Sequence, residues 1–189
     1  MRVLLMVLIS NVCYCQSLVF GLAGGARLTN DIDAPATGES NRYIVGPMIE
    51  LGLPLGFAAE ADALYSREGY YFAYNGALVQ STNAWEFPLL LKYRLPVPIV
   101  KPYAEAGWEP RVGRACPVYN CPEGSVGTTE GFVIGGGVQF GIGRLRLSPE
   151  IRYVRWNKPA IVEVIADGPT FQSAQNEVDL LVGIGWKLH

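Results

Sequence analysis

The sequence lacks a long apolar run. After its N-terminal segment, no stretch approaches the roughly 20 apolar residues of a membrane-spanning helix. Half of the 189 residues are nevertheless hydrophobic, and they do not follow the period of an amphipathic helix. If this chain crosses a membrane, it must do so as strands.

An excess of positive charge is also missing. The chain has 15 lysine and arginine residues against 17 aspartate and glutamate residues, for a net charge of -2. Binding to a phosphate backbone depends on a clear surplus of lysine and arginine. We therefore expect no nucleic-acid partner.

Catalytic signatures are scarce. The single histidine, His189, ends the chain, and no Gly-x-Ser-x-Gly nucleophile elbow occurs. The glycines at 135–137 follow no strand-to-helix pattern, so they do not form a nucleotide-binding fingerprint. We expect no enzymatic activity, no catalytic residue and no cofactor.

Residues 1–15 are typical of a cleavable secretory signal peptide, with Arg2 as its positive charge and residues 3–9 as a short apolar core. Cleavage after Cys15 leaves 16–189 as one domain. A lipoprotein acylated at Cys13 or Cys15 is the alternative, but the small residue expected before the cysteine is missing. Export implies contact with the export and barrel-assembly machinery.

Two further cysteines, Cys116 and Cys121, lie between predicted strands. In an exported chain they meet an oxidising compartment, which favours a local disulfide bond between them. Metal binding is the alternative, but two cysteines need further ligands. We predict the disulfide and no metal site.

From Ser17 onward, apolar and polar residues alternate with a period of two, in segments of the length that a tilted strand needs to cross a bilayer. Phe87, Leu89 and Leu91, for example, alternate with Glu86 and Lys92. The eight predicted strands are 17–29, 42–53, 57–65, 85–95, 103–111, 131–142, 144–153 and 177–188.

The connections alternate between short and long. Short turns are predicted at 54–56, at 96–99 and around Gly143, and long loops at 30–41, 66–83, 113–128 and 157–176. Short turns at one end and long loops at the other are typical of outer-membrane barrels. In the second long loop, Tyr70, Tyr71, Phe72 and Tyr74 form a candidate surface for an extracellular ligand. The alternative is that they cap the barrel mouth or extend its strands into a hairpin.

The charged residues fall on the faces that we assign to the barrel interior. Because both signs occur in comparable number, we interpret them as structural ion pairs rather than as acid/base pairs. The predicted lumen charge network comprises Glu60, Asp62, Glu86, Lys92, Arg94, Glu105, Arg144, Arg146, Glu150, Arg152, Glu177 and Asp179.

Pro47 and Pro149 lie inside predicted strands, where each removes a hydrogen-bond donor. We expect β-bulges at both positions.

The sequence Phe-Pro-Leu-Leu-Leu-Lys-Tyr at 87–93, followed by Lys-Pro-Tyr-Ala-Glu-Ala-Gly at 101–107, resembles the central hairpin of outer-membrane β-barrel domain families. The PorT-like group is the most similar, with OmpX and the OmpA barrel as broader relatives. The segment 183–188 is similar to the terminal assembly signal of such barrels, although His189 follows it. The resemblance implies a fold and an outer-membrane location, and family members have diverse roles.

We therefore expect an all-β, eight-stranded antiparallel transmembrane up-and-down β-barrel, surrounded by lipid in the bacterial outer membrane as a monomer. Its predicted role is structural or surface-binding. A soluble, lipocalin-like carrier of a small ligand is the alternative, but the interior charges argue against the apolar cavity it needs. A lipid-modifying enzyme is a less favoured alternative.

Overall fold

A computed structural model of the chain describes residues 17–29, 42–73, 77–114, 126–158, 162–164, 170–172 and 174–188. The predicted leader, the two cysteines of the predicted disulfide and Tyr74 lie outside these ranges. Their structural roles therefore stay predictions.

The described residues form strands joined by turns, with one short 3-10 turn, η1 (Pro54–Gly56). No helix among them is long and apolar enough to span a membrane. The strands are β1 (Ser17–Arg27), β2 (Tyr43–Gly52), β3 (Phe57–Asp62), β4 (Leu64–Ala73), β5 (Ala77–Glu86), β6 (Leu89–Arg94), β7 (Val100–Arg114), β8 (Val126–Ile142), β9 (Leu145–Trp156), β10 (Val162–Val164), β11 (Thr170–Gln172) and β12 (Asn176–Lys187).

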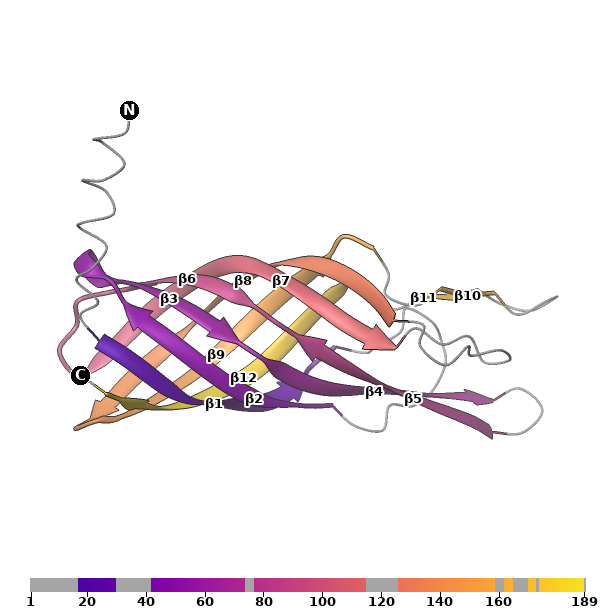
Figure 1. Cartoon of the computed structure of the whole chain (residues 1–189), viewed down its shortest axis with the longest axis horizontal. Helices are drawn as coiled ribbons and strands as arrows, with labels where there is room; N and C mark the ends of the chain where they lie inside the picture. Colours follow the sequence, from indigo (N-terminus) through magenta and orange to yellow (C-terminus); the bar gives the residue numbers. More distant parts are fainter. Residues whose placement is uncertain are drawn as a thin grey trace, which may run out of the picture.

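The main sheet closes on itself as a barrel (Figure 1), because β1 pairs with β2 on one side and with β12 on the other. All of its pairings are antiparallel. β3 and β4 together occupy one position around the barrel, and β5 and β6 together occupy the next. The ten strands of the sheet therefore form an eight-stranded barrel. The predicted eight-stranded up-and-down barrel is confirmed.

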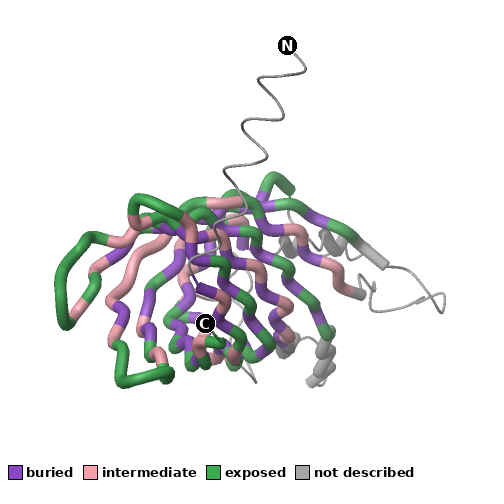
Figure 2. Tube along the Cα trace, turned by 60° about the vertical axis from the view of Figure 1, so that its left-hand side comes forward, coloured by how far each residue is buried: buried purple, intermediate pink, exposed green. Residues whose placement is uncertain are grey.

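Along the barrel strands, buried and exposed residues alternate (Figure 2), in agreement with the faces assigned from the sequence. In β6, Leu89 and Leu91 are 51% and 53% exposed, whereas Leu90 and Lys92 are each 3% exposed. The apolar residues exposed on the outside form a belt that includes Phe20, Leu22, Val45, Ile49, Leu89, Leu91, Phe132, Ile134, Ile151, Leu180 and Ile184.

The expectation of bulges at Pro47 and Pro149 was wrong. Each residue from Ser17 to Ala26 has one partner in β2, and Pro47 pairs with Leu22 in that continuous register. Pro149 likewise pairs with Val182 in the unbroken ladder between β9 and β12. The missing donor of Pro47 instead interrupts the neighbouring ladder at Ala63, between β3 and β4, where the Ala63 N–H still donates to the Pro47 carbonyl at 3.0 Å.

For the second long loop, predicted at 66–83, the structure favours the alternative of a hairpin that extends the strands. Most of it is a hairpin in which β4 and β5 pair continuously, from Leu64 with Glu86 to Ala73 with Ala77. Polar and glycine residues within 66–83 hid this strand pattern in the sequence. The fourth loop, 157–176, also contains a short hairpin, β10–β11. The short turns lie together at the opposite end of the barrel, which we call the short-turn mouth (Figure 1).

The face assignment can be tested at two positions of β6. Replacing the exposed Leu89 by Arg should lower the free energy of unfolding in lipid by roughly 2 to 4 kcal/mol if it lies near the bilayer midplane. A nitroxide probe at Leu89 should be relaxed by a lipid-soluble relaxation agent, and a nitroxide probe at Lys92 should not. A probe at Lys92 that meets lipid while one at Leu89 is shielded would mean that the barrel is inside out.

Candidate functional site: the charged lumen

The lumen contains nine buried carboxylates, which are Glu50, Glu60, Asp62, Glu86, Glu105, Glu109, Glu150, Glu177 and Asp179. Period-two alternation places them inside because their strand neighbours form the apolar belt. A buried carboxylate is costly unless it is paired with a cation and hydrogen-bonded. The ion pairs of the lumen fall into three clusters, at its centre, toward the loops and at the short-turn mouth.

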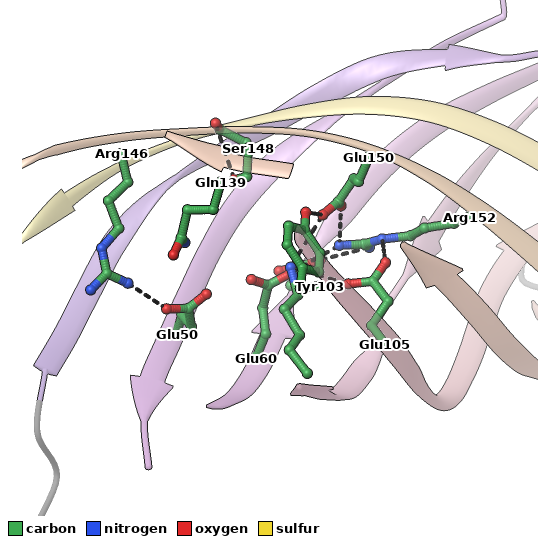
Figure 3. A network of polar contacts seen from close by, with 12 residues as sticks. Glu50, Glu60, Tyr103, Glu105, Gln139, Arg146, Ser148, Glu150 and Arg152 are labelled. Atoms are coloured by element: carbon green, nitrogen blue, oxygen red, sulfur yellow. Dashed lines mark hydrogen bonds and ion pairs between the residues drawn. The ribbon is translucent and has the colours of Figure 1, made fainter. Parts of the chain in front are cut away.

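The central cluster is built around Arg152, which is almost fully buried (Figure 3). Its guanidinium lies 2.5 Å from Glu150, 2.8 Å from Asp62, 2.9 Å from Glu60 and 3.1 Å from Glu105. These carboxylates come from β3, β7 and β9, so Arg152 connects opposite walls of the barrel. Its planar fork of five N–H donors suits several acceptors at once.

Lys92 completes the central cluster. Its Nζ lies 2.7 Å from Glu60, 3.1 Å from Glu105 and 3.2 Å from Glu150. It also lies 4.8 Å from the centre of the Tyr103 ring, and the Tyr103 hydroxyl donates to Glu150.

These same three carboxylates lie close enough together to hold a metal ion, with ligand oxygens within 4.8 Å of one another. The ammonium of Lys92, however, already contacts all three. A lysine thus supplies the positive charge that a cation would bring to this site.

The distal cluster lies toward the long loops and centres on Glu86. Arg27 and Arg111 approach Glu86 to 2.8 and 2.7 Å, and both arginines also contact Glu177. Arg27 lies 3.5 Å from Asp179 as well. The Arg111 guanidinium stacks 3.9 Å from the centre of the Trp156 ring, which adds a cation–π contact to the ion pairs.

The mouth cluster consists of Glu50, Arg94 and Arg146, with Gln139 and Ser17 as hydrogen-bond acceptors. One oxygen of Glu50 accepts from Arg94 at 3.0 Å and from Arg146 at 2.6 Å. Arg94 also donates to Gln139 at 3.2 Å, and Arg146 to Ser17 at 3.2 Å. These arginines line a cavity of about 830 Å³ that occupies the short-turn mouth.

Arg144 is the exception among the predicted lumen residues, because it is exposed in the turn between β8 and β9. The predicted strand began at 144, whereas β9 begins at Leu145, so the alternation does not extend to this residue. The other predicted lumen residues all lie in the ion-paired clusters. Sequence reasoning missed Trp156, because the predicted strand ended three residues before β9 does.

The predicted loop surface is only partly placed. Tyr70, Tyr71 and Phe72 lie in β4 and pair with Gln80, Val79 and Leu78. Their backbone is therefore part of the β4–β5 hairpin rather than of an irregular loop.

At the level of sequence, neither a family profile nor a curated protein matches the chain. Solved structures match over nearly its whole length. The N-terminal β-barrel domain of Pseudomonas aeruginosa OprF has a TM-score of 0.56 and 11% identity, covering 91% of this chain and 97% of that one. Neisserial surface protein A has a TM-score of 0.55 and 14% identity, covering 90% and 96%.

A third match is Ail, the attachment invasion locus protein of Yersinia pestis, crystallised in complex with the heparin analogue sucrose octasulfate. Its TM-score is 0.51 at 10% identity, covering 91% of this chain and 97% of that one. At such low identity these likenesses establish the fold.

Removing the ammonium of the central cluster should be strongly destabilising. Lys92→Met leaves Glu60, Glu105 and Glu150 with Arg152 as the remaining cation beside them, so part of their buried charge is uncompensated and the free energy of unfolding should fall by about 3 to 5 kcal/mol. Urea unfolding in lipid vesicles measures it. Adding Glu60→Gln to the variant should recover part of the loss, because one of the uncompensated charges disappears.

Arg144→Met is the matched control, since this exposed cation should change stability by no more than about 0.5 kcal/mol. Equal urea midpoints for Lys92→Met and the wild type would contradict the ion-pair arrangement of the central cluster.

Proposed function

We propose that this chain is an integral outer-membrane β-barrel, closed to solutes by its ion-paired lumen, that presents a protruding hairpin as a binding element at the cell surface. The observation that carries the proposal is the inverted polarity of the barrel, with apolar residues outside and carboxylates buried inside. Water would disfavour so continuous an apolar exterior, whereas lipid favours it.

A soluble carrier of an apolar ligand fits the lumen poorly. Such a barrel needs an apolar cavity, but the centre of this lumen is filled by Arg152, Lys92 and their carboxylates. Eight strands enclose an interior just wide enough for side chains to fill. The ion pairs join facing walls, so they also argue against an open pore and in favour of a role located at the ends of the barrel.

The β4–β5 hairpin is the element best placed for such a role. Within the described residues, β4 pairs with the barrel wall only at Tyr65 and Ser66, and β5 only at residues 84–86. From Arg67 with Asn83 to Ala73 with Ala77, the two strands pair with each other alone. The hairpin therefore extends beyond the barrel (Figure 1), with unpaired strand edges that a partner can use.

The comparisons support a surface role for this fold. Ail binds a heparin analogue in its crystals, and another of the matched barrels is a surface protein by name. We place the present chain in the same kind of setting, exported through the leader at 1–15, with 16–189 as the barrel domain and a disulfide between Cys116 and Cys121. The role that we assign is non-catalytic.

The membrane location and the closed lumen are tested together. The mature chain should require detergent for extraction, and its gel mobility should shift on boiling, as a folded barrel's does. Reconstituted into planar bilayers, it should give no stable conductance steps of porin size. Recovery as a detergent-free soluble monomer would overturn the membrane proposal, and porin-size steps would overturn the closed lumen.

Surface presentation of the hairpin is tested by proteolysis of intact cells. Chymotrypsin cuts after aromatic residues, so it should cleave within 70–74 and leave the barrel intact, because an isolated two-stranded hairpin is marginally stable. In the control, Asn-Gly replaces residues 69–81 and joins the paired Glu68 and Thr82 by a tight turn.

That control should insert at the wild-type level and lose the cleavage within 70–74, because the excised residues pair only with each other within the described part of the chain. Cleavage that occurs only after the outer membrane is opened would place the hairpin on the inner side and reverse the proposed orientation.

A further inference from the structure

The short-turn mouth holds a cavity of about 830 Å³ with cations on several sides. Arg94, Lys101, Arg146 and Lys187 line it, and they come from β6, β7, β9 and β12. The lining residues that the structure describes include no carboxylate. The opening of the barrel at this end is thus ringed by positive charge.

The positive charge of this ring is only partly neutralised. Arg94 and Arg146 share one carboxylate, Glu50, so one negative charge serves two guanidinium groups. Lys101 and Lys187 form no ion pair with any residue that the structure describes. An anion that enters the cavity therefore meets a surplus of cations.

The two arginines are also held in place. Their side chains are only 12% and 16% exposed. Glu50 fixes both, while Gln139 and the Phe57 carbonyl accept from Arg94, and Ser17 accepts from Arg146. Each guanidinium carries five N–H donors, more than these bonds use. Pre-positioned guanidinium groups bind phosphate through paired hydrogen bonds at little further entropic cost.

The rim of the cavity is apolar, which is unusual for turns in water. Leu55, Ile99 and Ile142, one from each of the three short turns or their edges, are 86%, 81% and 78% exposed. Just beyond them on the barrel wall, the rings of Phe57 and Tyr93 pack with centres 5.0 Å apart. Aromatic residues favour the boundary between acyl chains and headgroups. These features place the short-turn mouth at the depth of lipid headgroups.

We propose that the short-turn mouth binds the phosphodiester headgroup of an anionic phospholipid from the leaflet that surrounds it. The inference rests on the proposed membrane location. The cation ring supplies the charge, the apolar turn tips pack against the lipid at the boundary between headgroup and acyl chains, and a cavity of this volume accommodates a headgroup. We expect the bound group to be a phosphate rather than a carboxylate, because hydrogen-bond donors from several strands surround the one opening of the cavity.

The test uses the full mature barrel in mixed micelles of phosphatidylglycerol and phosphatidylcholine, with the lipids that stay bound counted by native mass spectrometry. The wild type should retain phosphatidylglycerol preferentially. Lys101→Gln with Lys187→Gln should lower this preference roughly thirtyfold, because each lysine near an anionic lipid contributes about one factor of five. These lysines have no described ion-pair partner, so their loss should not impair folding.

Arg94→Gln with Arg146→Gln should lower the preference further, and Arg144→Gln, which removes an exposed cation beside the mouth but outside the cavity lining, should leave it unchanged. Wild-type preference in both double variants, measured on barrels that still shift on boiling, would overturn this inference and leave the membrane proposal intact. Recovery of the wild-type barrel in solution without detergent would overturn the membrane proposal itself.

The source of the phosphate is tested with sn-glycero-3-phosphoglycerol, which has the headgroup's phosphodiester but no acyl chains. It should fail to displace the lipid at equal concentration. Displacement at equal concentration would overturn the lipid assignment and show that the mouth takes a soluble phosphoester. High salt should weaken lipid retention in either case, since the charges lie near water.

Discussion

The structure depends on neutralising carboxylates inside a barrel too narrow to hydrate them. Nine of them are buried, and Arg152 alone contacts four. An unpaired ion in such an interior costs several kcal/mol. The positions of the strands around the lumen are therefore tied to the positions of the charges, since a shift of one residue in a strand would carry that strand's charges to the apolar outer face.

Because of this constraint, the centre of the barrel and its two ends differ in how freely their residues can vary. The central cluster joins facing walls. With the lumen closed as proposed, the chemistry available to other molecules is confined to the two ends. At one end a hairpin stands clear of the wall, and at the other a cavity opens among cations. Both ends can vary without disturbing the ion pairs between them.

The faces of the barrel strands followed from the sequence because the side-chain period of a strand is two and the apolar residues keep to one face. Leu89 and Lys92 could be assigned to opposite sides on that basis alone. The pairing of Lys92 with three particular carboxylates could not, since it depends on which strands face one another across the lumen.

Other features left no local pattern in the sequence. The hairpin at 67–83 pairs only with itself among the described residues, and its sequence does not alternate strictly between apolar and polar residues, so it was predicted as a long loop. Trp156 continues β9 beyond the predicted strand end, and its contact with Arg111 arises only when β7 and β9 face the same lumen. Pro47 looked incompatible with a regular ladder because sequence alone does not show which neighbour loses the hydrogen bond.

The seam between β1 and β12 has a consequence for the time course of folding. It pairs Val19 with Lys187 and Arg27 with Asp179. One edge of β1 therefore stays unpaired until β12 has formed. Pairing between residues so far apart in the sequence is slow, and an unpaired strand edge can meanwhile pair with another chain. Arg152 reaches Glu60 and Asp62 across shorter gaps in the sequence, 92 and 90 residues, and all three residues precede β12. A chain released before its final strand would still have open edges at β1 and β9, and would be a substrate for aggregation or proteolysis rather than a smaller barrel.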